Sequence, residues 1–559
     1  VYDAAAAPAP EQHLTPFYPA TEGVHQLTLR RVITQALDTR LDGLHEWLPE
    51  EILSELKLPT LQQALAYVHR PPPDARVEIL EQGRHPAQQR LVFEELLAHH
   101  LSLKRRRAQL TRQRAPVIET PGKLAAALQA QLPFVLTDAQ QRVIAEIVRD
   151  LAKAHPMQRL LQGDVGSGKT LVAAAAALHA IEAGLQVAVM APTELLAEQH
   201  WRNFNEWLRP LAVDTAWLSG KLAAKERAAV LDAIGAGAAP LAVGTHALFQ
   251  GDVTFKNLGL VIVDEQHRFG VHQRLLLREK GNKDGRLPHQ LTMTATPIPR
   301  TLAQALYADL DVSVIDELPP GRTPVETVVV PDSRRAEVVS RVRRACLDGR
   351  QAYWVCPLIE ESEALELQTA TETEAALRAA LPEISIRLVH GRMKAQEKER
   401  AMAAFKAGAV QLLVATTVIE VGVDVPNASL MIVEHAERLG LAQLHQLRGR
   451  VGRGAAHSSC VLMYHGSLSE NARERLSVLR ATNDGFEIAR KDLEMRGPGE
   501  VLGTRQTGIS EFHIADVMRD QALLPKIERT AELLLARHPE CVTPLIRRWL
   551  GGREQYAEV

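Results

Sequence analysis

Gly163-Asp164-Val165-Gly166-Ser167-Gly168-Lys169-Thr170 decides the fold, because this stretch matches the phosphate-binding pattern G-x-x-x-x-G-K-[ST]. Its glycines permit backbone angles that let successive N–H groups surround phosphate oxygens. The lysine is expected to neutralise charge on the β- and γ-phosphates, and the threonine hydroxyl to ligate Mg²⁺. The stretch therefore predicts a site for ATP and Mg²⁺, whose expected members are Gly163, Gly166, Ser167, Gly168, Lys169 and Thr170.

The residues on either side of this loop favour a strand before it and a helix after it. Residues 159–162 are a short apolar run typical of a buried strand, and the Ala-rich residues 171–181 predict a helix. The N-terminus of that helix would face the phosphates, where its backbone N–H groups favour negative charge. This strand, loop and helix arrangement is the one that phosphate binding requires.

A second apolar strand is expected at residues 258–263, and it is followed by Asp264-Glu265-Gln266-His267. A carboxylate at the carboxyl end of a parallel strand can hold Mg²⁺, and its neighbour can orient and deprotonate the attacking water. We assign Asp264 to the metal and Glu265 to the water. The alternative is an ordinary acidic turn after a strand.

A third stretch, Gln446-Leu447-Arg448-Gly449-Arg450-Val451-Gly452-Arg453, offers arginines to the same chemistry. We expect Arg450 and Arg453 one turn apart on a helix, reaching across a cleft to the γ-phosphate. There an arginine stabilises charge that develops in the transition state. Gln446 opens this stretch and is grouped with the catalytic residues.

The alternation of strands and helices predicts two parallel-sheet α/β domains in tandem. The Pro/Gly-containing residues 318–322 interrupt the pattern and are a candidate hinge. In the first domain, further strands are expected at residues 186–190, 241–243 and 290–292. In the second, which has no phosphate loop, strands are expected at residues 325–330, 352–357, 386–389, 411–415, 430–433 and 460–464. The expected boundaries are 1–12 for a linker, 13–118 for a helical region, 119–317 and 318–466 for the sheet domains, and 467–559 for a C-terminal region.

The region before the first sheet domain has helical spacing, with helices expected at residues 27–41, 61–68 and 88–114. The end of the last helix carries a basic cluster without acidic residues: Lys104, Arg105, Arg106, Arg107, Arg112 and Arg114. Contact with the DNA backbone and a merely solvated helix end are both consistent with this cluster.

Composition narrows the class of protein without deciding it. The 559 residues predict three to four domains, and the 46% hydrophobic content is enough for large cores. A net charge of −2 excludes a globally basic protein, so nucleic acid would have to contact local patches. The spacing of the four cysteines predicts no zinc site and favours a reducing cytoplasm, and no run is long enough to span a membrane. The absence of an initiator Met suggests that upstream residues are removed or not represented.

The ordered set of motifs resembles superfamily 2 helicases and translocases over residues 134–454. Phe134 and Gln140 resemble the element that reads adenine. Segments 191–200, 244–249 and 389–393 resemble motifs that contact nucleic acid. Segment 294–297 resembles the motif that couples hydrolysis to movement, and 415–424 the motif that touches both DNA and the cleft. The acidic box followed by residues 268–271 narrows the resemblance to the RecG family of bacterial DNA helicases.

The C-terminal region supports that narrowing. Helices are expected at residues 468–482 and 486–495, separated by Asn483-Asp484-Gly485 and followed by a glycine-rich loop. This hairpin and loop resemble the translocation motif shared by RecG and the transcription-repair coupling factor Mfd. The resemblance implies that it grips duplex DNA and couples ATP turnover to stepping, and the residues assigned to this are Arg475, Arg496, Arg505 and Gln506. The alternative is a helical cap with a flexible loop.

The resemblance implies a monomeric ATP-dependent helicase that remodels branched and double-stranded DNA, reversing stalled forks and migrating Holliday junctions. Single-strand-binding protein is an open candidate partner. RecG proteins also carry an N-terminal wedge domain, and no barrel-like run of strands occurs before Pro133, so impaired fork recognition is expected of this chain. Two alternatives stay open: an Mfd-like translocase acting on protein roadblocks, and a DNA clamp that ATP gates without stepping.

Overall fold

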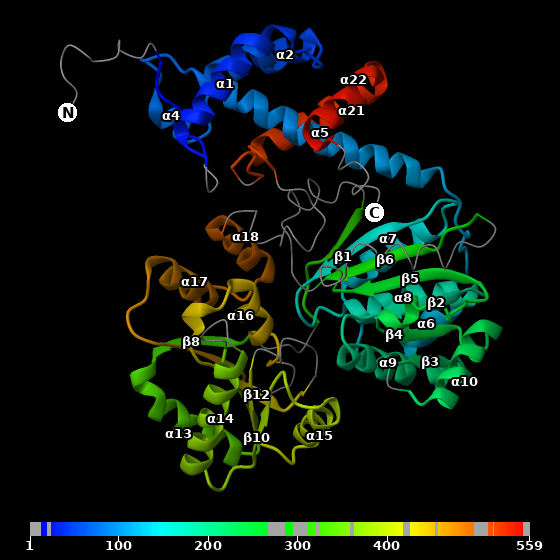
Figure 1. The fold of residues 1–559 in the computed structure, drawn as a ribbon. Helices are drawn as coiled ribbons and strands as arrows, with labels where there is room; N and C mark the ends of the chain where they lie inside the picture. Colours follow the sequence, from blue (N-terminus) through cyan, green and yellow to red (C-terminus); the bar gives the residue numbers. More distant parts are fainter. Residues whose placement is uncertain are drawn as a thin grey trace. The chain divides into compact units, whose positions relative to one another are not determined.

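The chain divides into two compact units (Figure 1). A computed structural model describes residues 13–19, 24–220, 222–265, 285–294, 310–319, 324–357, 363–416, 425–452, 457–496, 512–517 and 519–551. One unit combines Val1–Arg106 with Gly508–Glu558, and the other consists of Arg107–Thr507 with the terminal Val559. None of the helices described is long and apolar enough to cross a membrane.

The first unit is helical, as the sequence predicts. Its long helix α5, Pro86–Thr111, corresponds to the helix expected at 88–114 and continues past the unit boundary. The C-terminal helices α21 and α22 lie beside α5 (Figure 1). The helices of this unit are α1 (Gln26–Arg40), α2 (Glu50–Leu56), α3 (Leu61–His69), α4 (Val77–Glu81), α5, α21 (Leu524–Arg537) and α22 (Pro539–Leu550).

Two adjacent carboxylates of α5 hold the C-terminal segment in this unit. Glu95 is buried and accepts hydrogen bonds from the backbone N–H groups of Ile514 (2.9 Å) and Ala515 (2.8 Å). Glu94 is also buried and accepts from Arg548 at 2.6 Å and from the indole of Trp549 at 3.1 Å. Buried carboxylates need such donors, so these contacts anchor the end of the chain to α5. The sequence analysis groups residues 467–559 as one region, and that boundary stays a prediction. The long-range partners of Glu94 and Glu95 leave no local signal in the sequence.

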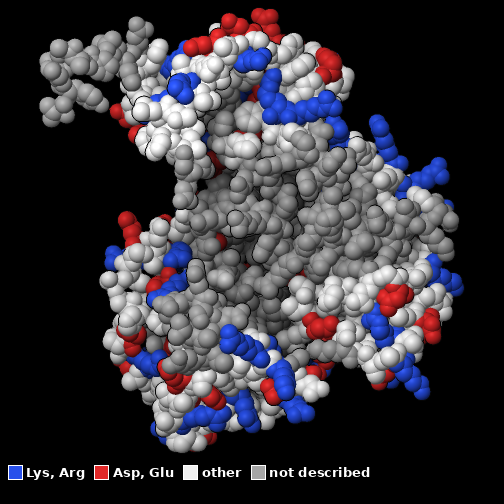
Figure 2. Space-filling model, in the orientation of Figure 1, with Lys and Arg blue, Asp and Glu red and all other residues white. Residues whose placement is uncertain are grey.

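The basic cluster of α5 is partly neutralised by contacts within each unit. Lys104 lies 3.1 Å from Glu532, and Arg105 donates to the Thr543 hydroxyl at 3.5 Å. In the second unit, Arg107 lies 2.7 Å from Asp311. Figure 2 shows basic side chains along the surface of this helix. DNA contact by the cluster stays a prediction, and three of its members have other partners.

The first sheet has the parallel order β3-β4-β2-β5-β6-β1-β7 in the described residues. The central strands β2 and β5 are buried throughout, as expected when helices cover both faces of a sheet. The edge strands β3 and β7 were not predicted, because they are short and only partly apolar. The strands are β1 (Gln158–Gly163), β2 (Gln186–Met190), β3 (Thr215–Leu218), β4 (Leu241–Gly244), β5 (Leu258–Asp264), β6 (His289–Thr294) and β7 (Asp311–Ile315).

Helices pack on both faces of this sheet and complete two apolar cores. One core joins the sheet to α7 and α8, and the other lies on the opposite face. The helices of this sheet domain are α6 (Lys123–Gln131), α7 (Asp138–Leu151), α8 (Lys169–Glu182), α9 (Glu194–Leu208) and α10 (Ala224–Ala236).

The second sheet has the parallel order β10-β11-β9-β12-β13-β8 and confirms the predicted tandem α/β architecture. Its strands are β8 (Glu326–Pro331), β9 (Gln351–Val355), β10 (Ile386–Val389), β11 (Leu412–Ala415), β12 (Ala428–Val433) and β13 (Ser459–Tyr464). Its helices are α13 (Arg335–Leu347), α14 (Glu363–Ala380), α15 (Ala395–Lys406) and α16 (Leu441–Arg448). The predicted hairpin follows as α17 (Glu470–Ala481) and α18 (Gly485–Arg496), and its apolar side chains join the core around α16.

Candidate active site

The phosphate loop connects β1 to α8 in a conformation that depends on glycine. Gly166 and Gly168 have φ angles of +77° and +88°, in the left-handed region that other residues rarely adopt. At Gly163 the constraint is close packing, since an added Cβ would lie 2.5 Å from Ser167 Oγ. The loop therefore places the backbone N–H groups at the start of α8 as the sequence predicts.

Two side chains in this loop fit a phosphate group. Lys169 donates hydrogen bonds from Nζ to the carbonyls of Gly163 at 2.7 Å and Asp164 at 2.9 Å, so its ammonium lies against the loop. Ser167 Oγ is buried without a hydrogen-bond partner in the described residues. Buried hydroxyls rarely lack a partner, and an oxyanion would supply one. A cationic lysine, an unsatisfied hydroxyl and the N-terminus of a helix together fit the triphosphate.

Gln140 supports the loop from the side. It is buried in the capping box at the start of α7, where its Oε1 accepts from the Thr137 N–H at 3.0 Å. Its Nε2 donates to the Ser167 carbonyl at 2.8 Å, which fixes the loop backbone. Phe134 has 45% of its surface exposed, which leaves a ring face for stacking. The adenine-reading role of both residues stays a prediction.

Asp264 ends β5 and is paired with a histidine that the sequence analysis did not single out. His200 of α9 donates from Nε2 to Asp264 Oδ2 at 2.7 Å, and both residues are buried. Burial raises the pKa of Asp264, but the hydrogen bond and charge of His200, with Lys169 and the Glu265 N–H, hold that pKa below its usual value. Asp264 is thus kept as a carboxylate, the form that ligates Mg²⁺. Thr170 lies in the first turn of α8 and is half-buried.

Glu265 has an unusual backbone. Its φ of +52° lies in the left-handed region, which costs a non-glycine residue on the order of 1–3 kcal/mol. Hydrogen bonds from its N–H to the Met293 carbonyl at 3.0 Å and to Asp264 Oδ1 at 3.1 Å hold it there. Strain of this kind concentrates at functional sites, where it orients a side chain. It supports a catalytic role for Glu265.

The phosphate loop contacts α16, which carries the arginine stretch. His445 of α16 donates from Nε2 to Asp164 Oδ1 at 2.6 Å. An added Cβ on Gly449 would lie 2.8 Å from Val165 Cβ, so the two backbones approach closely. An added Cβ on Gly485, at the start of α18, would lie 2.8 Å from the His445 ring. The phosphate loop, α16 and the hairpin therefore meet at His445.

Arg448 continues this chain of contacts into the hairpin. It is buried, donates from Nη2 to His445 Nδ1 at 2.9 Å, and donates from Nη1 to the carbonyls of Leu479 (2.9 Å) and Thr482 (2.8 Å). Since aspartate accepts and arginine only donates, one neutral tautomer of His445, with its proton on Nε2, satisfies Asp164 and Arg448 together.

The structure corrects the expected helical placement of Arg450, one of the two arginines assigned to the γ-phosphate. Helix α16 ends at Arg448, and Arg450 lies in the following turn, with its N–H bonded to the Leu447 carbonyl at 3.0 Å. Glycine has a low helix propensity, so its presence at position 449 favours this early end. Gln446 is half-buried on α16, and Arg453 lies outside the described residues.

The residues assigned to translocation are only partly described. Arg475 of α17 donates to the carbonyls of Leu439 at 3.0 Å and Glu437 at 2.7 Å, which ties the hairpin to the second sheet domain. Arg496 ends α18, but its side chain, Arg505 and Gln506 lie outside the described residues. Residues 295–297 of the expected coupling motif, and 417–424 of the motif expected to touch both DNA and the cleft, also lie outside them.

Two of the expected nucleic-acid motifs are joined by Glu194. Its carboxylate accepts from the Ser219 hydroxyl at 2.6 Å and from the Thr245 hydroxyl at 3.3 Å. Segments 191–200 and 244–249 therefore share one edge of the first sheet, where the carboxyl ends of the strands lie. Contact between these segments and nucleic acid stays a prediction.

Sequence reasoning missed His200, Asp164, His445 and Arg448 as members of the site. Three of these residues lie inside stretches that had been quoted for other positions: Asp164 within the phosphate loop, His200 at the end of segment 191–200, and Arg448 between Gln446 and Arg450. The contacts of three of them depend on partners more than 60 residues away, since His200 and Asp264 are 64 positions apart and Asp164 and His445 are 281 apart. Arg448 contacts Leu479 and Thr482, which are 31 and 34 positions away. The signal that could have identified them was that each quoted motif contained a polar residue to which no role had been assigned.

The chain matches three known protein families along its length. Residues 137–305 match the DEAD/DEAH box helicase family, and residues 337–455 match the helicase conserved C-terminal domain. Residues 482–548 match the family described as ATP-dependent DNA helicase RecG, domain 3, C-terminal. The last match covers α18, α21 and α22, and so extends over both units.

Individual relatives are similar over almost the whole chain. The ATP-dependent DNA helicase RecG of Escherichia coli (strain K12) is 59% identical over 555 residues, which cover 99% of this chain and 80% of the relative. RecG of Aquifex aeolicus (strain VF5) is 43% identical and covers 92% of this chain, with 65% of its own length covered. A solved structure of RecG bound to a three-way DNA junction is similar with a TM-score of 0.71 and 41% identity, covering 92% of this chain and 66% of that one.

Proposed function

We propose a function for this chain on the basis of its family, because the chain belongs to the RecG family of ATP-dependent DNA helicases. As a member, it is an ATP-hydrolysing DNA helicase. In finer detail, we propose that it translocates on double-stranded DNA and remodels branched DNA, reversing stalled forks and migrating Holliday junctions in recombination and repair. The relative solved with a three-way DNA junction supports a branched substrate.

The residues around the phosphate loop supply the hydrolysis chemistry in this proposal. Lys169 and the loop N–H groups bind the β- and γ-phosphates, and Thr170 and Asp264 would hold Mg²⁺. Bound Mg²⁺ would supply neutralisation of charge on the phosphate oxygens. Glu265, fixed by its strained backbone, orients the attacking water and accepts its proton. Arg450 and Arg453 stabilise the charge that develops on the γ-phosphate.

One observation supports the proposal that hydrolysis is coupled to movement. Asp164 in the phosphate loop, His445 and Arg448 form a hydrogen-bonded chain that ends on the Leu479 and Thr482 carbonyls of the hairpin. A change in the loop that moves Asp164 would therefore be transmitted to the C-terminal end of α17. The hairpin would then move the following loop, with Arg496, Arg505 and Gln506 contacting the DNA backbone, and Arg475 keeping the hairpin on the second sheet domain.

Displacement of a labelled DNA triplex tests the stepping motor. The chain should displace the third strand with ATP and Mg²⁺ and not with a non-hydrolysable ATP analogue, and Lys169→Ala should displace none. A non-stepping clamp would hydrolyse ATP and bind duplex without displacing the triplex, which would contradict the proposal. Because fork recognition is expected to be impaired in this chain, turnover with branched DNA should exceed turnover with duplex or single-stranded DNA by only a reduced margin.

An Mfd-like translocase remains the alternative among motors. It would displace the triplex equally well but gain no additional turnover from a branch point. The stimulation of turnover by branched over linear duplex DNA therefore separates the two proposals. We also propose that the protein is a cytoplasmic monomer and that single-strand-binding protein is one of its partners. These proposals rest on the resemblance to the RecG family.

A further inference from the structure

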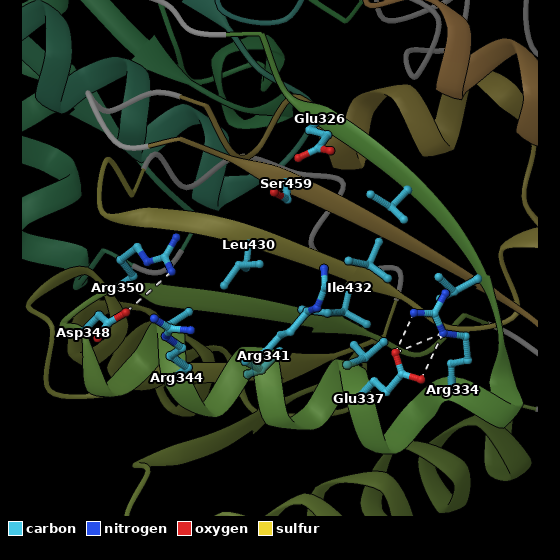
Figure 3. Close-up of a pocket in the computed structure, with 16 residues that line it drawn as sticks. Glu326, Arg334, Glu337, Arg341, Arg344, Asp348, Arg350, Leu430, Ile432 and Ser459 are labelled. Carbon is cyan, nitrogen blue, oxygen red and sulfur yellow. Dashed lines mark hydrogen bonds and ion pairs between the residues drawn. The ribbon is translucent and has the colours of Figure 1, made fainter.

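A groove lies on the α13 side of the second sheet, away from α16. Its cavity of about 590 Å³ lies between α13 and the strands β12, β13 and β8 (Figure 3). A volume of this size suits a small ligand or a few residues of a peptide. Its floor is aliphatic and consists of Val328, Val330, Leu430, Ile432 and Val461.

This groove is distinct from the ATP site. Most of its floor belongs to the core on the α13 and α14 side of the sheet, or packs directly against that core. The apolar residues of α16, which carries His445, belong to the core on the opposite face. The sheet therefore separates the groove from the phosphate loop and the hairpin.

The wall of the groove has four arginines, of which two are paired with neighbouring carboxylates. For Arg341 and Arg344 no ion pair is found in the part of the chain that the structure describes. The hydrogen bond from Arg334 and, less strongly, the charge of Arg341 lower the pKa of Glu337, which lies one turn away from Arg341. Arg334 pairs with Glu337 at 2.5 Å, and Arg350 lies 3.9 Å from Asp348. Arg341 and Arg344 line the same cavity from exposed positions on α13, and Figure 3 shows Arg341 directed from the helix toward the strands. The groove thus combines an apolar floor with two exposed cations that can bind carboxylates.

The spacing of these cations matches an extended peptide. Arg341 and Arg344 are three positions apart on a helix, so their Cβ atoms are about 5–6 Å apart. In an extended chain, residues two apart lie about 6.5 Å apart on one face, and the residues between them face the other way. Two carboxylates at alternate positions would therefore reach both arginines, while aliphatic side chains between them contact the floor.

The same lining disfavours nucleic acid. Bases bind proteins by stacking on aromatic rings, and the lining residues include no aromatic side chain. Glu326, Glu337 and Asp348 also line the cavity and would repel a phosphate backbone. Glu337 and Asp348 lie one turn from Arg341 and Arg344, respectively, and would repel an acidic peptide as well. The preference for a peptide therefore rests on its aliphatic side chains, which suit the apolar floor.

We infer that this groove is a docking site for an extended acidic segment of a partner protein, in which carboxylates alternate with aliphatic side chains. The carboxylates pair with Arg341 and Arg344. The aliphatic side chains contact Val328 and Val461, the partly exposed residues of a floor whose other members are buried in the core. Binding here would recruit the chain to a partner without occupying the ATP site.

Fluorescence anisotropy with labelled peptides tests this inference. A short peptide of alternating Glu and Val should bind the whole chain, and its affinity should fall about tenfold or more in Arg341→Glu/Arg344→Glu. A matched variant, Arg387→Glu/Lys406→Glu, makes the same charge change at exposed positions of the same sheet domain and should stay within about twofold. DNA-stimulated ATP turnover checks that each variant is folded.

Two further peptides separate the contributions of charge and apolar floor. Replacing each Val by Ser keeps the charge and should abolish binding, as should replacing each Glu by Lys. Equal affinity for both double variants, or for the Ser peptide, would overturn the inference. So would a labelled oligonucleotide that binds through Arg341 and Arg344 in place of the peptide.

Discussion

The two sheets share their strand order but differ in the connection after their first strand. The order β3-β4-β2-β5-β6-β1 of the first sheet corresponds strand for strand to β10-β11-β9-β12-β13-β8 of the second. After β1 the chain passes through Gly166 and Gly168 into α8, whereas after β8 it passes through Asp332–Arg334, a short helical turn without glycine, into α13. The architecture is common to both domains, and the phosphate site depends on one connecting loop.

The carboxylates at the ends of β5 and β12 also differ in their surroundings, although the backbone after each is alike. Asp264 ends β5 and is followed by Glu265 at φ +52°, and Glu434 follows β12 and is followed by His435 at φ +46°. Glu434 accepts from the Trp354 indole at 2.9 Å and pairs with Arg335 at 2.5 Å. The same backbone feature thus follows the two carboxylates proposed to be catalytic in one sheet and a carboxylate held in an ion pair in the other.

The largest effect is expected at the first residue of the helix after each loop. Lys169→Ala should lower ATP turnover about a hundredfold or more, because no other side chain of the loop neutralises phosphate charge. Arg335→Ala, at the equivalent position of α13, should leave turnover within about twofold and lower the thermal midpoint. Steady-state ATPase assays and thermal melts check both, and equal loss of turnover in the two variants would remove the contrast.

A similar effect is expected at the carboxylates. Glu265→Gln should lower kcat about a hundredfold while nucleotide binding persists, because an amide cannot accept the proton from water. Glu434→Gln should retain turnover but reduce the free energy of unfolding by about 1–3 kcal/mol, since Arg335 loses its anion. Nucleotide titration, kcat and denaturant unfolding separate these outcomes. Normal kcat in Glu265→Gln would exclude it as the base.

A smaller effect on ATP turnover should follow from adding a methyl group where the backbones of the phosphate loop and α16 approach closely. Gly449→Ala places a methyl against Val165, so turnover should fall about tenfold as the contact is forced apart. Gly251→Ala is the matched control, because an added Cβ there meets nothing within 4 Å. If Gly449→Ala left turnover and its DNA stimulation intact, this contact would be dispensable.

The smallest effect is expected from relieving backbone strain in the second sheet. His435→Gly removes the cost of the left-handed conformation, so the free energy of unfolding should change by less than about 1 kcal/mol, with glycine entropy opposing the relief. ATP turnover should be unchanged. A destabilisation of several kcal/mol, measured by denaturant unfolding, would show that the His435 side chain has a structural role.

The sequence predicted the elements whose signal is local. The glycine loop, the buried central strands and the hairpin around Gly485 all have short-range patterns, and the structure places them at the predicted residues. The edge strands β3 and β7 were missed because partly exposed strands lack a continuous apolar run.

The contacts between distant segments could not be predicted from one sequence. His200, His445 and the C-terminal helices that return to Glu94 and Glu95 depend on partners far along the chain. The helix expected through Arg450 ended early at Arg448 because local periodicity does not fix where a helix stops.

The coupling of ATP hydrolysis to movement through His445 is tested most directly by one ratio, the triplex displacement per ATP hydrolysed. His445→Ala should keep ATP turnover within about threefold and lower this ratio about tenfold or more, because the chain from Asp164 to Arg448 and the hairpin is broken. His457→Ala, an exposed histidine of the same domain, should leave the ratio unchanged. An unaltered ratio in His445→Ala would contradict the account.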